Sequence, residues 1–210
     1  MKVIQPQVYI ESDISEDDAI MLIEKAGRVC YKSENKIKND SGKTFIRNIL
    51  KRGHESVIEH VSVTVRVICD RGVSHEIVRH RIASYSQEST RYCNYSDDKF
   101  GNEITVIAPC FFNDDEYGYK VWRDACQFAE DAYFEMLKYG ASPQEARSVL
   151  PNSLKTEMII TMNLREWRHF FRLRCSPAAH PQMRQIANMI LNQFEELFPL
   201  FVEDIERFEF

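Results

Sequence analysis

The chain has 210 residues, 44% of them hydrophobic, and a formal net charge of −5 at pH 7. This length suits one large domain or two small ones, and the apolar content is sufficient for a hydrophobic core. The acidic balance argues against a protein that binds nucleic acid through its overall charge. Any anionic ligand must therefore be attracted by a local group of cations.

Sequence signals for export and for membrane insertion are missing. The first segment, MKVIQPQVYIESD, has no cationic stretch followed by an apolar one, as a signal peptide would have. No apolar run approaches the ~20 residues of a membrane span. We therefore expect a cytoplasmic protein that binds neither membranes nor nucleic acid.

The cysteines do not form a recognisable motif. The chain contains six, and no two of them make a CxxC pair. This argues against zinc ribbons and thioredoxin-like redox motifs. Without a secretion signal, we expect reduced and mostly buried thiols. Cys93 and Cys175 adjoin polar segments, so these two are expected to be the most exposed.

Hydrophobic periodicity predicts one α+β domain over residues 1–210, with a sheet flanked by helices. The elements expected in the first half are helices over residues 15–31 and 41–53, a strand over 60–68 and a short helix over 73–80. Ser15 and Asp18 can cap the first helix, and Ser41 and Gly53 can begin and end the second. One face of the strand is formed by Val61, Val63, Val65 and Val67.

In the second half, the elements expected are helices over 119–140, 142–151, 163–174 and after Pro181, and a strand over 154–163. Ser142 and Asn163 can cap two of these helices. The longest helix is predicted to bury a stripe formed by Val121, Ala125, Phe128, Ala129, Ala132 and Met136. The last helix is predicted to bury Met183, Ile186, Ala187, Ile190, Phe194 and Leu197.

Common cofactor and metal motifs are absent. The glycines are too far apart for GxGxxG or a P-loop. The segment HEIVRH resembles the zinc motif HExxH, but His75 and His80 are five residues apart. On a helix they would point about 140° away from each other, so we expect no shared metal. His54 is of more interest, because it follows Gly53 in a polar turn before a strand.

The cations are the most informative feature. RHRIASYSQESTRY (79–92) is expected to form a hydroxyl-rich loop after a helix, with arginines among serines and threonine. Guanidinium forks and hydroxyl donors are the groups that bind phosphate. Elsewhere, the expected role is an ordinary solvated ion pair; this applies to Arg47, Arg123, Arg168 and Arg172.

Several segments together resemble one family. RHRIASYSQES fits RHR, seven residues and then Ser, which is the signature of the flavin-dependent thymidylate synthases. RGHESVIEH, EARSVLP, MNLREWRHFFRLR and HPQ are similar to further motifs of that family, and they occur in the same order from about Gly53 to Gln182.

The resemblance implies a reaction and an assembly. In this family, methylenetetrahydrofolate gives a one-carbon unit to C5 of dUMP, FAD carries the hydride and NADPH reduces the flavin. The products are dTMP and tetrahydrofolate. The family assembles as a homotetramer whose active sites take residues from several subunits, and it needs no catalytic cysteine.

The resemblance also implies roles for individual residues. Arg174 would be catalytic by polarising the uracil ring. The residues that would hold dUMP are Glu76, Arg79, Gln87, Glu88, Ser89, Thr90, Arg91, Arg147 and Arg174. Those that would contact FAD are Ser56, Arg79, His80, Arg81, Gln87, Asn163, Arg165 and His169. His54 would help to place the folate.

The chain departs from some relatives of the family at three places. Glu76 stands where Gln is frequent, His169 where Asn is frequent, and Ser86–Gln87 where many members have Asn or Glu. A carboxylate at Glu76 would be unfavourable beside a nucleotide unless Arg79 or Arg81 pairs with it. One alternative function is an arginine-rich module that binds phosphate or RNA without catalysis, although it explains neither the acidic net charge nor the turn at His54.

Overall fold

The computed structural model describes residues 1–208, except for the side chain of Lys99. The strands are β1 (Lys2–Ile4), β2 (Gln7–Ile10), β3 (Ser62–Asp70), β4 (Ala83–Gln87), β5 (Thr105–Ile107) and β6 (Lys155–Asn163). The helices are α1 (Glu16–Val29), α2 (Ser41–Lys51), α3 (Arg71–Ile77), α4 (Tyr117–Lys138), α5 (Pro143–Ala146), α6 (Leu164–Arg174), α7 (Pro181–Leu197) and α8 (Pro199–Val202), with short 3₁₀-helices η1 (Glu34–Lys36), η2 (Glu55–His60), η3 (Asp98–Phe100) and η4 (Arg147–Val149). The predicted α+β class is confirmed.

The strands form two sheets. One has the order β2-β3-β6-β4, and the other pairs β1 with β5 in parallel, with Val3 opposite Val106. The residues group into two compact units. Unit 1 comprises Met1–Gln7, Val67–Arg79 and Ser86–Met158, and unit 2 comprises Val8–Arg66, His80–Tyr85 and Ile159–Phe210. The expectation of a single domain stays a prediction.

Local sequence rules explain most of the elements. Val63, Val65 and Val67 of β3 are fully buried, as their alternation predicts. Ser15 Oγ accepts the backbone N–H of Asp18 at the start of α1. Asn163 caps α6 in the same way, because its Oδ1 accepts the N–H of Glu166 at 2.9 Å.

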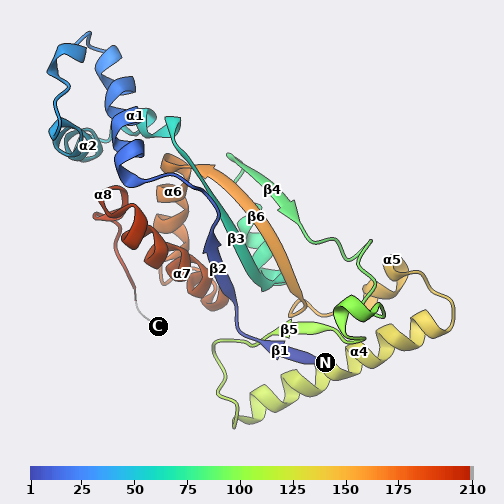
Figure 1. Cartoon of the computed structure of the whole chain (residues 1–210). Coiled ribbons are helices and arrows are strands. Elements are labelled where there is room, and N and C mark those ends of the chain that lie inside the picture. The colour runs from blue at the N-terminus through green and yellow to red at the C-terminus, as the bar shows by residue number, and fades with distance from the viewer. Residues whose placement is uncertain (209–210) are drawn as a thin grey trace. The chain divides into compact units, whose positions relative to one another are not determined.

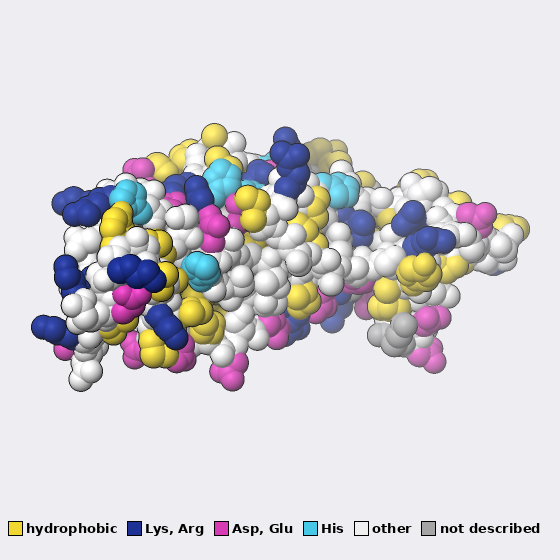
Figure 2. All heavy atoms as spheres, turned by 90° about the horizontal axis from the view of Figure 1, so that it is seen from above, with side chains coloured by type: hydrophobic (Ala, Val, Ile, Leu, Met, Phe, Trp, Pro, Cys, Tyr) yellow, Lys and Arg dark blue, Asp and Glu magenta, His cyan; other side chains and the backbone are white. Residues whose placement is uncertain are grey.

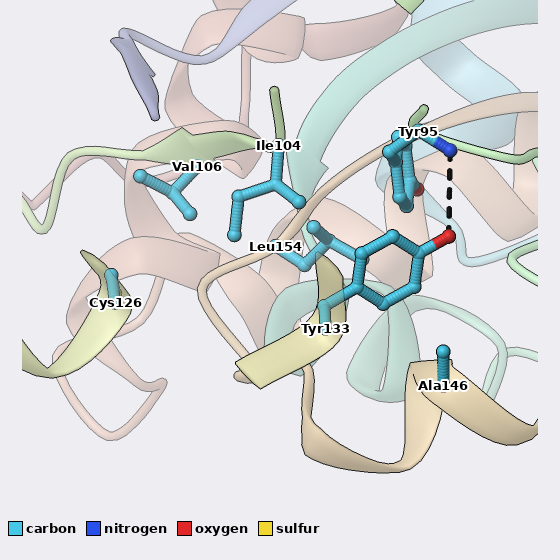
Figure 3. Packing of buried hydrophobic residues seen from close by; sticks show 7 residues of the cluster. All are labelled: Tyr95, Ile104, Val106, Cys126, Tyr133, Ala146 and Leu154. Carbon is cyan, nitrogen blue, oxygen red and sulfur yellow. Dashed lines mark hydrogen bonds between the residues drawn. The ribbon is translucent and has the colours of Figure 1, made fainter. Parts of the chain in front are cut away.

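The core of unit 1 lies where α4 runs along β1 and β5 (Figure 1). Figure 3 shows the buried cluster, which consists of Tyr95, Ile104, Val106, Cys126, Tyr133, Ala146 and Leu154. The hydroxyl group of Tyr133 accepts the backbone N–H of Tyr95 at 3.4 Å. This bond gives the one polar group of the Tyr133 ring a partner inside the cluster.

The predicted buried stripe of α4 is wrong for Val121, Ala125 and Phe128, whereas Met136 packs against the buried cluster. The residues of α4 that are buried are Cys126, Glu130 and Tyr133. Val121 is 50% exposed and Phe128 is 76% exposed, and Ala125 is also exposed. The helix carries apolar residues on two faces, and Glu130 lies inward because the amino terminus and the N–H of Ile104 bind its carboxylate. A buried charge that finds partners of this kind is permitted inside.

The core of unit 2 is aromatic. Trp167 stacks on Phe171 with the ring centroids 5.9 Å apart and meets Phe194 of α7 at 5.4 Å. Trp167 Nε1 also donates to the carbonyl of Val63 at 2.9 Å, which attaches α6 to β3. Figure 1 shows α6 and α7 beside β2. The side-chain amide of Gln193 on α7 donates to the backbone carbonyl of Val8 and accepts the backbone N–H of Ile10, both in β2.

Two further expectations are corrected by the structure. Leu197, expected in the buried stripe of the last helix, is 48% exposed because α7 ends there and the chain turns into α8. The hydroxyl-rich segment expected as a loop contains the strand β4 (Ala83–Gln87). Its alternating polar side chains gave no apolar face by which a strand could be predicted. Among residues 1–208, no helix combines the length and apolar character needed to span a membrane.

Candidate active site

In unit 1, a group of two arginines and two hydroxyls forms after β4. The chain turns at Ser89, whose carbonyl accepts the backbone N–H groups of Tyr92 and Cys93. Arg147 Nη1 donates to Thr90 Oγ1 at 3.2 Å. Arg91 Nε donates to Gln144 Oε1 at 3.1 Å. We call Ser89, Thr90, Arg91 and Arg147 the arginine–hydroxyl group, because two exposed guanidinium groups lie beside the half-buried Ser89 and the buried Thr90. Side chains of these kinds are suited to phosphate.

The capping box of α5 positions half of this group. Ser142 and Glu145 bind each other reciprocally at its start, as the sequence predicts, and Arg147 follows at its end. The short helix thereby holds Gln144 and Arg147 toward the turn at Ser89. The cap thus positions Gln144 and Arg147 in addition to stabilising the helix.

Two residues predicted to bind dUMP, Gln87 and Glu88, contact other side chains within unit 1. Gln87 Nε2 donates to Ser74 Oγ at 3.0 Å and to Thr156 Oγ1 at 3.1 Å. Glu88 Oε2 binds Lys155 Nζ at 2.7 Å. Both side chains are half-buried, so they hold the end of β4 in place. Of the remaining predictions, Glu76 is half-buried in α3, and Arg79 is exposed two residues after α3 ends.

In unit 2, polar residues of α6 line a cavity of about 400 Å³. The lining consists of Glu55, Glu59, Ile82, Asn163, Arg165, Glu166, His169 and Arg172. Asn163, Arg165 and His169 are the predicted FAD contacts on this helix, and the cavity brings them together. Arg165 and His169 are four residues apart and therefore share a face of the helix. Arg165 forms an ion pair with Glu59 of η2.

A buried histidine connects this part of unit 2 to Arg174. Arg174 Nε donates to His80 Nε2 at 3.1 Å, and His80 Nδ1 lies 3.2 Å from Glu166 Oε1. Burial, followed by the charges of Arg174 and His169, lowers the pKa of His80 to about 4. The imidazole is therefore neutral at pH 7. Since Nε2 accepts from Arg174, the single ring proton resides on Nδ1 and is donated to Glu166.

The same donors could suggest a metal site, but their bonds indicate otherwise. Ligand atoms of His80, Glu166 and His169 lie within 4.8 Å of one another. The guanidinium of Arg174, however, occupies the acceptor face of His80. A permanent cation at that position opposes a second cation, so we interpret the cluster as a hydrogen-bonded network.

The predicted folate and flavin residues of η2 are exposed on a well-anchored segment. His54 and Ser56 are exposed, and Glu55 between them binds both Arg168 and Arg172. Burial raises the pKa of Glu55, but its two arginines outweigh this effect and hold the pKa below its usual value. The remaining predicted flavin contact in unit 2, Arg81, is exposed.

Two sequence expectations fail around the site. Arg168, expected on a solvated face, is 1% exposed and binds Asp204, Glu55 and the carbonyl of Phe201. Cys175, expected to be exposed, is 1% exposed, whereas Cys30 is the exposed cysteine. Cys175 lies at the C-terminal end of α6, directly after Arg174, and packs inward. Burial raises the pKa of its thiol to about 12, so it is no thiolate at neutral pH.

Sequence reasoning did not find Glu166, Tyr85 or Lys155. Glu166 lies three residues from the capping Asn163, which gave it the ordinary appearance of a capping residue. Tyr85 donates its hydroxyl to the carbonyl of His80 at 2.6 Å. No residue spacing links Tyr85, Glu166 and His80, because β4 and α6 are distant in sequence.

These bonds place groups of arginine, hydroxyl and histidine side chains on an α+β scaffold. A family model described as Thymidylate synthase complementing protein matches residues 14–200. A flavin-dependent thymidylate synthase from Geobacter sulfurreducens is 37% identical over 186 residues, which cover 85% of this chain and 78% of that protein. One from Pyrococcus abyssi is 37% identical over 172 residues, covering 80% and 70%. The chain therefore belongs to the family of the flavin-dependent thymidylate synthases.

A solved structure matches almost the whole chain. It is that of the UMP/dUMP methylase PolB from Streptomyces cacaoi bound with 5-Br dUMP, with a TM-score of 0.78 over 97% of this chain and 96% of that chain. The sequence identity is 23%. At this identity the likeness shows the fold alone.

Proposed function

We propose that this protein is a flavin-dependent thymidylate synthase that methylates dUMP to dTMP. Methylenetetrahydrofolate gives its one-carbon unit to C5 of dUMP, NADPH supplies the hydride by way of FAD, and tetrahydrofolate and NADP⁺ leave. The observation that carries the proposal is the family match over residues 14–200. The arginine and histidine chemistry of the two units agrees with it.

The arginine–hydroxyl group would hold the phosphate of dUMP. Arg91 and Arg147 can each offer a planar fork to phosphate oxygens, and Ser89 and Thr90 add hydroxyl donors. Ser89 Oγ accepts the backbone N–H of Arg91 at 3.3 Å, and within residues 1–208 no histidine hydrogen-bonds it. Ser89 therefore has no base to activate it as a nucleophile, and we assign it to binding.

Arg174 would act on the uracil ring. A planar guanidinium can bind a ring carbonyl and an adjacent deprotonated nitrogen at once, so the contact strengthens as negative charge develops. The neutral imidazole of His80 holds Nε of this guanidinium at 3.1 Å. No thiolate is required, which agrees with the burial of Cys69, Cys126 and Cys175 and the raised pKa of each thiol.

The donors of the unit 2 cavity fit a flavin dinucleotide. FAD carries a pyrophosphate, and Arg165 can bind it once Glu59, which is also exposed, yields its ion pair. The side-chain amide of Asn163 and the ring of His169 can bind neutral polar edges. When bound, the flavin supplies hydride transfer. Asn163, Arg165 and His169 would hold it, together with Ser56 and Arg81; contacts from Arg79, His80 and Gln87 stay predictions from the family motif.

His54 would place the folate. It is exposed at the start of η2, directly after Gly53, whose φ of 69° lets the chain turn out of α2. The ion pairs of Glu55 with Arg168 and Arg172 hold the segment that carries it. A polar side chain on an anchored turn is suited to orienting a ligand without moving on binding.

We also infer a homotetramer whose active sites take residues from more than one subunit. The exposed face of α4 with Val121, Ala125 and Phe128 supports this inference, because such an apolar helix face is normally covered by a partner. A cytoplasmic location is part of the same proposal.

One experiment tests the proposed function. Purified protein is titrated with FAD, reduced with NADPH, and then mixed with methylenetetrahydrofolate and either dUMP or UMP. We expect flavin absorbance in the purified or titrated protein, and flavin reoxidation with dTMP formation when dUMP is added. Protein that stays colourless with added FAD would contradict the proposal and favour a binding module without catalysis.

A further inference from the structure

We propose that His80 and Glu166 are positioning residues that set the plane of the Arg174 guanidinium before substrate arrives. This inference rests on the proposed function, because it gives Arg174 its task. It assigns to the middle residue of the RHR segment a role inside the protein. The three side chains form one chain of hydrogen bonds, all within unit 2.

The hydrogen bond to Nε fixes more than one atom of Arg174. A guanidinium is planar, so its Nε and both Nη atoms move as one rigid group. Holding Nε–H against His80 Nε2 at 3.1 Å restricts rotation about the bonds of the side chain. The side chain of Arg174 is half-buried at the last residue of α6, where an unrestrained arginine would sample many rotamers.

His80 can accept this bond only in one tautomer. Its Nε2 must carry a lone pair, which places the proton on Nδ1. Glu166 Oε1 lies 3.2 Å from Nδ1 and stabilises that proton position. The carboxylate of Glu166 therefore selects the tautomer of His80, and this tautomer orients the guanidinium of Arg174. Orientation of a histidine by a buried carboxylate is a known way of fixing ring chemistry.

The surroundings hold the imidazole itself in place. Its side chain is 3% exposed. The ring meets Phe170 at a centroid distance of 5.0 Å and His169 at 5.7 Å. Tyr85 binds the backbone carbonyl of His80 at 2.6 Å. An imidazole that moved would not orient Arg174. The contacts of His80 leave its ring little freedom to move.

The test compares two substitutions of His80. Gln places its Oε1 close to the position of Nε2 and can still accept from Arg174, whereas Phe retains a packed ring and has no acceptor. We expect H80F to slow dTMP formation in a single turnover by ~10–100-fold, with dUMP affinity changed little, because small misplacements of a catalytic group have costs of this size. H80Q should recover most of the rate. The exposed His60 provides the control, and H60F should change neither quantity.

A second pair of variants tests the tautomer. E166Q keeps an oxygen that accepts from Nδ1–H, so it should behave nearly as the wild type. E166L removes the acceptor and leaves the His80 ring in place. We expect E166L to slow turnover as H80F does, and this pair carries the test if H80F does not fold. If Glu166 had only a structural role, E166L and E166Q would lose stability but would form dTMP at similar rates.

The geometry is also measurable without flavin or substrate. Nitrogen-15 spectra of the wild type at neutral pH should show His80 protonated at Nδ1 and not at Nε2, and the Nε–H signal of Arg174 should shift in H80F. These spectra remain informative if the wild type makes no dTMP, which would refute the proposed function separately. A proton on Nε2, or an H80F variant with wild-type turnover, would overturn the proposal.

Discussion

Cys175 shows how far the environment of a single residue decides its chemistry. It adjoins Arg174, which is proposed to act on the substrate, yet its side chain faces the core and is 1% exposed. Burial raises the pKa of its thiol to about 12. A cysteine next to a functional arginine in the sequence could suggest a nucleophile, but the structure places it among the packing residues of unit 2.

Replacing Cys175 with Ser should therefore reduce stability and leave the chemistry intact. A buried hydroxyl without a partner costs ~1–3 kcal/mol in the free energy of unfolding. Denaturant unfolding measures this loss, and dTMP formation per folded, flavin-bound protein should stay close to the wild type. The half-buried Cys93 provides the comparison, since Cys93→Ser should cost less. A loss of turnover by ~10⁴-fold in a folded variant would show that covalent catalysis operates.

His80 predicts a pH dependence of stability. Burial lowers its pKa to about 4 in the folded protein from the ordinary value of 6.5, which applies to the unfolded chain. Between these values the unfolded chain binds more protons, so stability decreases as the pH falls from about 6.5 toward about 4. Burial raises the pKa of Glu166 in the folded protein. The folded protein therefore keeps this proton to a higher pH than the unfolded chain does, so stability from this group decreases as the pH rises above the ordinary pKa of a glutamate.

The difference between wild type and H80F isolates the histidine. We expect the melting temperature of the wild type to fall more steeply than that of H80F over this pH window. Differential scanning fluorimetry at closely spaced pH values measures both slopes. Parallel slopes would mean that folding does not shift the pKa of His80, which would contradict its lowered pKa in the folded protein.

At the scale of elements, Arg168 of α6 holds η2 and the C-terminal segment together. It binds Glu55 at 3.1 Å through Nη2 and Asp204 at 2.6 Å through Nη1, and it also binds the carbonyl of Phe201. Coulombic and hydrogen-bonding partners raise its pKa despite burial, and Asp204 has its pKa lowered by Arg168. One residue of α6 thus anchors the segment on which His54 and Ser56 lie.

Removal of Arg168 should be strongly destabilising. Arg168→Ala leaves Glu55 without its buried partner, and losses of ~3–5 kcal/mol are usual for such a change. Arg47→Ala is the matched control, because the side chains of its ion pair with Glu203 are 56% and 45% exposed and the pair should contribute little to stability. Urea unfolding curves of both variants give the comparison. Equal losses would mean that Arg168 is no more important than a surface ion pair.

The same element shows what could be predicted from the sequence. The cap at Asn163, the extent of α6 and its aromatic core residues follow from local patterns. The burial of Arg168 does not, because its partners Glu55 and Asp204 lie far away in sequence and a periodicity argument assigns arginine to the surface. The motif residues of the candidate site were predicted from the family signature. Glu166 required the structure, since only its contact with His80 distinguishes it.

At the scale of the whole molecule, the net charge is −5. On the face seen in Figure 2, Asp, Glu and His side chains lie among the Lys and Arg side chains. A protein with this net charge and this mixture of signs on the visible face would need local groups of arginines to attract anions. This pattern agrees with small anionic substrates more than with the continuous basic surface that nucleic-acid binding requires.

The exposed face of α4 predicts how the assembly responds to mutation. Phe128 is 76% exposed, and a charged residue there would be unfavourable in a covered apolar interface. We expect Phe128→Asp to shift the protein toward smaller species in light scattering after size exclusion, with the helical content unchanged. Met21 of α1 is 65% exposed, and Met21→Asp serves as the control. An assembly that Phe128→Asp does not change would exclude this face from the interface.

The most direct measurement compares Arg174→Ala with Arg91→Ala in two assays, dUMP binding and single-turnover oxidation of the reduced flavin. Removal of a preorganised charge donor typically costs ~10²–10³ in rate. Arg174→Ala should bind FAD, accept electrons from NADPH and bind dUMP, but form dTMP slower by that factor, and Arg174→Lys should recover little because an ammonium has no planar fork. Arg91→Ala should instead lose dUMP affinity more than rate. Normal turnover of Arg174→Ala at saturating dUMP would contradict the account.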